Sequence, residues 1–280
     1  MRAMMDGVAT PVSEMDHVPL QQHPAHAAAL RAIGAGVLAV ALPDGGRANV
    51  LLRRFGPLTL ALLPRGPVWA DGRAPNLDDL RAVRHALPAR SILLVNGDTA
   101  LPATPRLLPL VTPQTIAEWD LRAALHQKWR NRLARAERAH LPICHRAMPP
   151  DPAHWLLQRE ATQARQRRYR PWPPALLAAH AAQGTAHLFV AGPTQAPVAA
   201  MLFLLTGRRA TYQIGWVNAD GRSADAHRLL LWQAARTLRE WGTTLLELGT
   251  IDTDTAPGLA RYKLGTGARP RVLGATALVM

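Results

Sequence analysis

The chain has 280 residues, 48% of them hydrophobic, which suffices for one large domain or two of ordinary size and excludes a wholly disordered chain. Its apolar runs, such as residues 198–205, are far shorter than the roughly 20 residues of a membrane-spanning helix, and a single cysteine, Cys144, excludes an internal disulfide and a thiol-rich zinc site. The net charge of +14 suits an anionic partner such as nucleic acid, a phosphorylated carrier or a membrane surface, although 31 of the 33 basic residues are arginine, which is also typical of a compositional bias.

The first twenty residues follow no periodic pattern and are predicted to form a flexible N-terminus. Charged residues are scattered through this segment, among them Arg2, Asp6, Glu14 and Asp16, so it contains no apolar stretch of the kind that a secretory signal needs. We therefore expect a cytoplasmic protein.

Residues 21–111 are predicted to form a small α/β domain. Apolar runs bounded by Gly and Pro indicate strands, and Asn76 followed by Asp78 and Asp79 is typical of a helix N-terminus. The expected elements are a helix over 24–33, strands over 37–42, 48–54 and 58–63, a helix over 76–86 and a strand over 91–95.

Residues 112–150 are predicted to be a linker and a basic helix. Residues 112–121 have no strong pattern and are expected to connect two domains. Over residues 121–139, apolar side chains recur every three or four residues, which predicts an amphipathic helix with a basic outer face. The apolar stripe consists of Leu121, Leu125, Trp129, Leu133 and Ala136.

Residues 151–280 are predicted to form a second and more complete domain. The expected elements are helices over 151–168 and 174–182, strands over 186–191, 197–205 and 209–215, a long apolar helix over 224–241, a strand over 244–248, a helix over 256–264 and a strand over 272–279. The fold class is therefore α/β (α+β), with a mixed central sheet flanked by helices in each domain.

Four segments stand out in this order of elements: LLPRGPV at 62–68, KWRNRLARAER at 128–138, AHRLLLW at 226–232 and GLARYKLGTG at 258–267. Together they resemble the FemABX-like branch of the GNAT acyltransferase superfamily, which includes the BioF2-like acetyltransferase domains. The resemblance covers residues 62–267, most of the chain. It implies two GNAT-like domains with a cleft between them, and transfer of an activated acyl or aminoacyl group to an amine.

Lys128 and Lys263 are the only lysines of the chain. Arginine is used at nearly every other basic position, so these two lysines are candidates for chemistry that needs the compact charge of an ammonium group rather than a planar guanidinium. The resemblance also points to Lys263 as the residue that stabilises negative charge on an oxyanion or a donor phosphate. A surface lysine in an ion pair is the alternative for Lys263, and Tyr262 beside it either supports the pocket wall or simply packs.

Basic residues at three places are candidates for binding the donor or the substrate. Arg65 follows a strand, and its forked guanidinium could bind a phosphate or carboxylate, unless it is only a turn residue. The basic helix could hold a nucleotide or an RNA backbone, or could be a solvated face. The full predicted set is Arg65, Lys128, Arg130, Asn131, Arg132, Arg222, His227 and Arg261.

The segment from Arg222 to His227 stands where a GNAT enzyme is expected to bind the pyrophosphate of CoA. Arg222 matches the first position of that loop, but the small-residue positions do not match. Asp225 would place a negative charge in the first turn of the helix, where the pyrophosphate should lie. This departure favours a donor other than CoA without excluding CoA bound in another way.

Several groups are candidates for the general base: Glu247 on a strand, Asp252 and Asp254 in the following loop, and His227 at the start of the long helix. Each has an alternative as a cap, a turn residue or a buried hydrogen-bonding group, and the base could also come from the substrate. The predicted catalytic set is Lys263, Tyr262, Glu247 and Asp252. The scattered histidines show no metal-ligand spacing, so no metal is expected.

The leading hypothesis is an N-acyltransferase that forms an amide bond, with a carrier or aminoacyl-tRNA as the favoured donor. An acyl-CoA-dependent enzyme of the BioF2-like type is the first alternative, and a non-catalytic anion- or RNA-binding module on a degenerate GNAT fold is the second. We expect no tightly bound cofactor, with acyl-CoA or aminoacyl-tRNA as co-substrate, and a small-molecule or peptide amine as acceptor. The sequence leaves the oligomeric state open.

Overall fold

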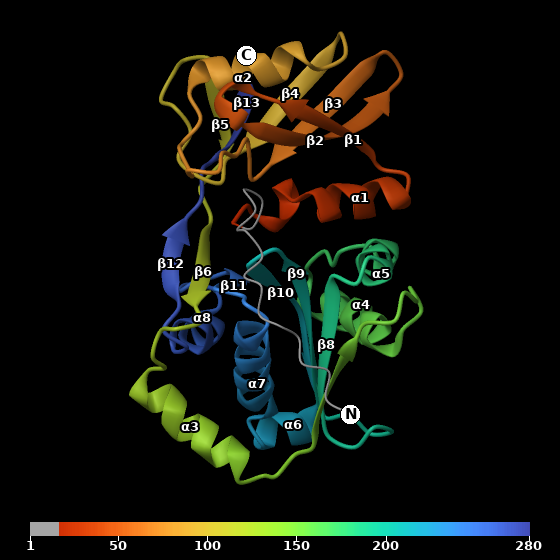
Figure 1. Ribbon diagram of the computed structural model, residues 1–280, viewed down its shortest axis with the longest axis vertical. Coiled ribbons are helices and arrows are strands. Elements are labelled where there is room, and N and C mark those ends of the chain that lie inside the picture. The colour runs from red at the N-terminus through yellow and green to blue at the C-terminus, as the bar shows by residue number, and fades with distance from the viewer. Residues whose placement is uncertain (1–16) are drawn as a thin grey trace, which may run out of the picture.

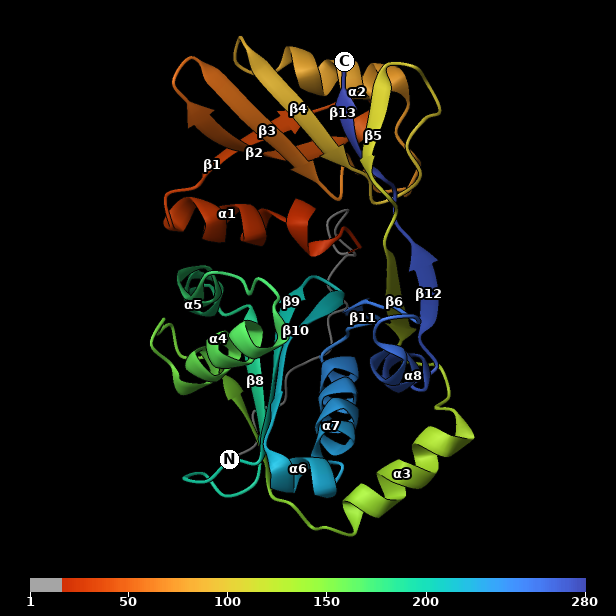
Figure 2. The ribbon, with the colours of Figure 1, turned by 180° about the vertical axis from the view of Figure 1, so that it is seen from behind.

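Two β-sheets with their helices lie at opposite ends of the molecule (Figures 1 and 2). The computed structural model describes residues 17–280, so residues 1–16 of the predicted flexible N-terminus lie outside the described residues. The first sheet has six strands and the second has seven. This is the two-domain α/β architecture expected from the sequence.

The first sheet is built mainly from the N-terminal part of the chain. Its strand order is β1-β2-β3-β4-β13-β5, and only β3 and β4 are parallel neighbours. Helix α2 (Leu77–His85) makes the crossover between those two strands, and the side chain of Asn76 caps it as predicted by accepting a bond from the backbone of Asp79. The strands are β1 (Gly36–Ala41), β2 (Arg47–Phe55), β3 (Leu58–Pro64), β4 (Ser91–Asn96), β5 (Leu107–Val111) and β13 (Thr276–Val279), with the 3-10 turn η2 (Pro43–Gly45) between β1 and β2.

The second sheet has the order β12-β6-β11-β10-β9-β8-β7, and only β10 and β11 are parallel neighbours. Its strands are β6 (Thr115–Asp120), β7 (Ile143–Ala147), β8 (Ala186–Ala191), β9 (Ala199–Thr206), β10 (Arg209–Val217), β11 (Leu245–Thr250) and β12 (Arg269–Val272). Both sheets therefore contain three antiparallel strands followed by a helical crossover to a parallel strand.

Helices cover both faces of the second sheet. Buried side chains of α3 (Gln127–Glu137) and α7 (Ala226–Glu240) form one core with the sheet. Buried side chains of α4 (Trp155–Arg167) and α5 (Pro174–Ala182) form a core on the opposite face. The short α6 (Ala219–Ser223) precedes α7, and α8 (Pro257–Leu264) follows β11.

Helix α1 (Pro24–Ala32) lies between the two halves of the molecule (Figure 2). On the side of the second domain, its His26 approaches His180 of α5, with 3.0 Å between Nδ1 and Nε2. The 3-10 turn η1 (Leu20–Gln22) precedes α1 and contacts both domains: Leu20 is buried in the core of the second, and the Gln22 side chain accepts from the Asn49 backbone of the first at 2.7 Å. The segment therefore holds the two halves together from one side.

The structure differs from the expected elements at the domain boundaries. Residues 112–121, expected as a connection, contain β6, which lies inside the second sheet between β12 and β11. The expected strand over 272–279 is two strands, β12 in the second sheet and β13 in the first. Residues 273–275 separate the two strands. Gly274 among them passes so close to the Thr99 carbonyl oxygen that an added Cβ would lie 2.2 Å from it. The predicted division at residues 111 and 150 therefore does not separate the two sheets cleanly.

The basic helix is shorter than expected. Residues 121–126 of the predicted helix form a turn, in which the Leu121 amide donates to the Thr244 carbonyl at 3.1 Å, and α3 begins only at Gln127. All five members of the predicted apolar stripe are nevertheless buried. Across residues 17–280, we find no helix with both the length and the apolar character required to cross a bilayer.

Removing the last strand tests this topology. β13 lies between β4 and β5 and is the only strand that pairs with β5 in the described chain. A chain ending at Gly274 should therefore lose two strand pairings, and its thermal midpoint should fall by roughly 10 °C or more. A chain lacking only Met280, which is 56% exposed, is the matched control. Equal midpoints for both shortened chains would contradict the strand order.

Candidate functional site

The parallel strands β10 and β11 diverge in the middle of the second sheet. They pair only from Arg209 opposite Leu245 to Thr211 opposite Glu247, although β10 continues to Val217. β11 then gains one residue relative to β6 between Glu247 and Thr250, which is a β-bulge, and Gly249 within it has a φ of +75°. The sheet is therefore opened at the carboxyl ends of these strands, a usual place for a ligand in an α/β sheet.

The amino group of Lys263 lies at this opened end of β11. Lys263 belongs to α8, is only 6% exposed and donates from Nζ to the Thr250 carbonyl at 2.7 Å. A Cβ atom added to Gly249 would lie 3.8 Å from Nζ. Burial lowers the pKa of Lys263 to about 8, although the negative charge of Glu247 opposes the shift. A buried ammonium whose pKa is this close to neutrality can stabilise a developing negative charge and can also give up its proton.

The hydrogen bonds of Tyr262 and His227 connect three helices. The Tyr262 hydroxyl donates to the His227 carbonyl at 3.0 Å, and the Tyr262 carbonyl accepts from the Trp129 indole at 3.1 Å. Burial raises the pKa of Tyr262 far above its usual range, so the hydroxyl stays protonated. Burial lowers the pKa of His227, whose Nε2 lies 2.9 Å from the Trp216 carbonyl, so His227 is a neutral donor there.

Arg65 and Glu247 bond to each other across the two domains. Arg65 donates from both terminal nitrogens to the two oxygens of Glu247, at 3.0 and 3.1 Å, and from Nε to Asp98 at 2.6 Å. Burial alone would lower the pKa of Arg65, but the two carboxylates raise it, so the guanidinium stays charged. The sequence predicts that Arg65 binds an anionic ligand and that Glu247 acts as a base. In the structure, the two side chains instead bond to each other and form a contact between the domains.

This contact is part of a closed ring of six charged side chains, which we call the interdomain ring. Besides the Arg65 contacts, Arg209 lies 2.8 Å from Glu118 and 3.5 Å from Glu247. Arg271 closes the ring, at 2.8 Å from Glu118 and 3.2 Å from Asp98. The ring consists of Arg65, Asp98, Arg271, Glu118, Arg209 and Glu247, so three arginines face three carboxylates.

Asp252 and Arg222 have local roles in their loops. The exposed Asp252 carboxylate accepts from the backbone of Asp254 and Thr255 and from the Thr255 hydroxyl, and these bonds lower its pKa. A carboxylate with a lowered pKa is a weaker base than usual. Arg222 donates to the Val217 carbonyl at 3.0 Å at the end of α6.

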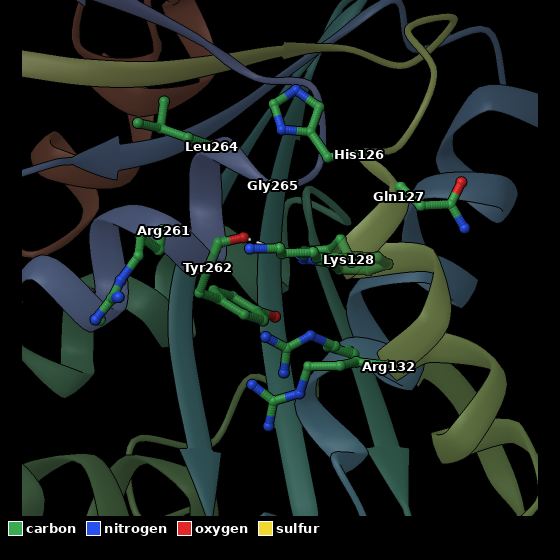
Figure 3. A pocket seen from close by; sticks show the side chains of 11 residues that line it. His126, Gln127, Lys128, Arg132, Arg261, Tyr262, Leu264 and Gly265 are labelled. Carbon is green, nitrogen blue, oxygen red and sulfur yellow. Dashed lines mark hydrogen bonds between the residues drawn. The ribbon is translucent and has the colours of Figure 1, made fainter.

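The basic residues of α3, α7 and α8 line a cavity of about 690 Å³, which we call the α3–α8 cavity. Figure 3 shows Lys128 and Arg132 projecting from α3 on one side, and Tyr262 and Arg261 belonging to α8 on the other. Arg130 and Asn131, which were predicted to bind a ligand, are not among the lining residues, and both bond to Gln127, which is. Lys263 does not line it either, since it lies on the face of α8 turned toward β11. The cavity and the Lys263 amino group thus lie on different sides of one helix.

Close packing holds the two helices that bound this cavity. The amide of His126 donates to the Gly265 carbonyl at 3.0 Å, and a Cβ on Gly265 would lie 2.7 Å from the Trp129 ring. Only glycine therefore allows α3 to approach the end of α8 this closely.

Asp225 is surrounded by three arginines at the start of α7. Its carboxylate is 3.0 Å from Arg132, 2.5 Å from Arg135 and 2.8 Å from Arg228, and its φ is +51°. The sequence places Asp225 at the helix start but gives no sign of its partners on α3. The sequence also misses four charged residues that are identified only by contacts far apart in the chain: Asp98, Glu118, Arg209 and Arg271. It misses Arg228 as well, whose bond to Asp225 is local but whose contacts with Trp129 and Tyr262 are not.

The sequence profile of the acetyltransferase (GNAT) domain matches residues 123–264, which is half of the chain and includes β10, α7, β11 and α8. This chain belongs to the acetyltransferase (GNAT) domain family. A comparison with curated protein sequences finds no match.

Solved structures show that this GNAT protein has the fold expected from the FemABX-like resemblance. The crystal structure of FemX superposes with a TM-score of 0.73 at 12% identity, over 94% of this chain and 92% of that one. A conserved protein of unknown function from Bacteroides thetaiotaomicron gives a TM-score of 0.64 at 15% identity, over 96% of this chain and 94% of that one. The C-terminal domain of a putative lysylphosphatidylglycerol synthetase from Agrobacterium fabrum gives a TM-score of 0.56 at 17% identity, over 93% of this chain and 88% of that one.

Family membership supports an acyltransferase in general terms. The roles of individual residues stay predictions. Among the predicted catalytic residues, the geometry favours Lys263, which lies where the GNAT sheet opens. Its ammonium makes one hydrogen bond among the described residues, to the Thr250 carbonyl, and so keeps further N–H donors for a ligand. Glu247 is held by Arg65, Asp252 by its own loop and the Tyr262 hydroxyl by the His227 carbonyl.

The stability of this GNAT protein should depend on pH through Lys263. The pKa of Lys263 is about 8 in the folded state and 10.5 in the unfolded chain, so the folded protein loses this proton at a lower pH than the unfolded chain does. Burial of the charged amine lowers the free energy of unfolding below pH 8, and this loss of stability disappears as pH rises from 8 to 10.5. Lys263→Met should therefore gain stability over the wild type near pH 7, and most of that gain, about 3 kcal/mol, should be gone by about pH 10. Chemical denaturation across this range measures the difference. Lys128→Met, which removes an exposed lysine, is the control for overall charge, and a Lys263→Met difference independent of pH would contradict the burial of a charged amine.

The interdomain ring should behave as a coupled unit. Arg65→Met leaves Glu247 and Asp98 with one arginine each and should lower the free energy of unfolding by about 3–5 kcal/mol. The double variant Arg65→Met/Glu247→Met removes both partners and should lose clearly less than the sum of the two single variants. Urea denaturation of all four proteins gives the coupling, and simple additivity would show that the ring does not act as a unit.

Proposed function

We propose that this protein is an N-acyltransferase that forms an amide bond by transferring an acyl or aminoacyl group from a carrier to an amine. The observation that carries the proposal is the buried amino group of Lys263 at the point where β10 and β11 separate. A fixed cation in a site shielded from water stabilises developing negative charge much better than a solvated one does. Membership of the GNAT family supports the same class of reaction.

The transfer needs three events at one carbon atom. The neutral amine attacks the activated carbonyl, a C–N bond forms, and the carbonyl oxygen becomes an oxyanion that the Lys263 ammonium stabilises. The oxyanion then returns its electron pair to form the carbonyl and the bond to the carrier breaks, while the attacking nitrogen loses its extra proton to the departing group or to water. Glu247, Asp252 and His227 are each engaged in hydrogen bonds within the protein, so we assign no general base to them.

Asp225 favours a carrier other than CoA bound in the usual GNAT manner. A pyrophosphate at the N-terminus of α7 would have to lie beside this carboxylate, which is 6% exposed and already bonded to three arginines. Like charges at such short range repel strongly in a buried site. One structural neighbour is named as a putative lysylphosphatidylglycerol synthetase, a name that refers to an aminoacylated product, which agrees with an aminoacyl donor. We therefore favour aminoacyl-tRNA as the donor.

Acyl-CoA is the second candidate donor, and one observation favours it. The three arginines around Asp225 outweigh its single negative charge, so the start of α7 still carries a net positive charge. The phosphates of CoA could use that charge from the side of the α3–α8 cavity.

Transfer assays with Lys263→Met test the proposal. Acetyl-CoA and charged tRNA are each offered with a panel of amines, and the variant should lose about 10²- to 10³-fold in kcat, as expected for loss of a group that stabilises an oxyanion. Since the protonated form of Lys263 is the active one, the wild-type rate per neutral amine should fall as pH rises through about 8. Thermal unfolding confirms that the variant is folded. Unchanged turnover in the folded variant would remove Lys263 from the mechanism, and no turnover with either donor would argue against the proposed function.

A further inference from the structure

We propose that Glu160 on α4 binds the ammonium group of the acceptor and takes one of its protons, so that the amine can attack the donor. The assignment of this amine as the acceptor rests on the proposed function. Glu160 is 8% exposed, and its surroundings differ from those of the other buried acids in the described part of the chain.

The difference lies in the charged partners. Three of the four buried acidic side chains in residues 17–280 bond to arginine at 3.0 Å or less: Asp79, Asp225 and Glu247. Glu160 is the fourth, and it forms no ion pair with any residue of this part of the chain. A buried carboxylate is costly unless a cation or several hydrogen bonds compensate it. Glu160 therefore has room for a cation that comes from outside the protein.

Two hydrogen bonds from neutral groups hold the Glu160 carboxylate. The Tyr169 hydroxyl donates to Oε1 at 2.7 Å, and the Gln163 amide nitrogen lies 3.3 Å from Oε2. Because an ionised carboxylate can accept about four hydrogen bonds, further acceptor positions remain for a ligand. Burial raises the pKa of Glu160, and Tyr169, Arg167 and Gln163 only partly oppose the shift. The carboxylate is therefore a stronger base than an exposed one.

The same hydrogen bonds connect Glu160 to the diverging part of β10. The Gln163 amide also donates to the Gly215 carbonyl at 3.2 Å, beyond the part of β10 that pairs with β11. A Cβ on Gly215 would overlap the Tyr212 hydroxyl oxygen, so only glycine leaves this place to a polar group. Lys263 bonds to the end of β11. Glu160 and Lys263 are thus attached to the two strands that bound the opening.

Tyr212 is the titratable group of β10 that faces Glu160. Burial, and after it the charge of Glu160, raises the pKa of Tyr212, so its hydroxyl stays protonated. A protonated tyrosine does not compete with Glu160 for a proton. Among the described groups beside the opened part of β10, Glu160 is therefore the one suited to act as a base.

Tyr169 provides the route from the solvent to Glu160. It follows the end of α4 and is 39% exposed, and yet its hydroxyl reaches the buried carboxylate. An ammonium N–H that replaces this hydroxyl exchanges a hydrogen bond from a neutral donor for one between two charges, which is roughly twice as strong. The acceptor is therefore an amine that is positively charged when it arrives.

The reaction at Glu160 moves one proton. An N–H bond of the ammonium breaks, its electron pair stays on nitrogen, and the proton forms an O–H bond with the carboxylate. The neutral nitrogen then attacks the activated carbonyl, whose oxyanion Lys263 stabilises. After the amide has left, the Glu160 carboxylic acid gives its proton to water, which restores the carboxylate for the next acceptor.

The first experiment measures amine binding without any donor. The probes are n-butylamine, which like a lysine side chain is charged near pH 7, and the uncharged n-butanol. In thermal unfolding of the whole protein, n-butylamine should raise the midpoint saturably for the wild type but not for Glu160→Gln, which removes the charge at nearly constant size. n-Butanol should not distinguish the two proteins. Absence of the rise in the wild type, or an equal rise in Glu160→Gln, would overturn the proposal.

Glu240→Gln is the matched control. It removes one negative charge at the exposed end of α7 and should bind n-butylamine like the wild type. An equal loss of binding in Glu240→Gln would show that n-butylamine responds only to the overall charge, and this too would overturn the proposal.

The second experiment measures transfer to two nucleophiles. Glu160→Gln should lower kcat/KM for n-butylamine by about 10²- to 10⁴-fold, as expected for a lost general base. It should lose far less with acetohydrazide, which is already neutral at pH 7 and needs no proton removed before attack. Equal losses with both nucleophiles would contradict the proton transfer. If n-butylamine binds at Glu160 but no donor gives turnover, the proposed function fails while the amine site stands.

Discussion

The interdomain ring is the contact on which the arrangement of the candidate site depends. Arg65 directly follows β3 of the first sheet and forms an ion pair with Glu247 on β11 of the second. Two residues beyond Glu247, the bulge at Gly249 turns β11 so that the Thr250 carbonyl meets the Lys263 amino group. Because all members of the ring are at least partly buried, a displacement of either domain would separate charges in a poorly solvated place. The first domain thus fixes the strand against which Lys263 lies.

The molecule uses its many arginines in two different ways. In the interdomain ring each guanidinium has its carboxylates, and the group is electrically neutral. Around Asp225 and the α3–α8 cavity the cations clearly outnumber the acids. The arginine-rich composition alone does not separate these uses, since both are built from the same residue type. What distinguishes them is the local ratio of charges, which becomes visible only when α3, α7 and α8 are brought together.

The sequence predicts those parts of the fold that local patterns encode. The apolar runs of β8 and β9 are properties of neighbouring residues, and the structure contains these strands close to the expected positions. The periodic stripe of residues 121–136 is buried as predicted, although only its last three members lie in α3. β5 is apolar in sequence, but Pro109 interrupts its run and most of its side chains are exposed. β7 is largely polar and exposed, and β6 is recognised only through its partners in the sheet. Lys263 could be found because lysine is rare in this chain. The pairing of Arg65 with Glu247, which are 182 positions apart, has no local signature at all.

The path of the chain also sets the order in which the molecule can assemble. During synthesis the strands β1 to β4 emerge first, yet β5 has no neighbour in the sheet until β13 arrives, more than 160 residues later. Contacts so distant along the chain form slowly, because a long loop has to close before they contribute. The second sheet, whose strands all precede β13, can be complete before the first one is. The sheet whose strands are made first therefore cannot be completed until the end of the chain has been made.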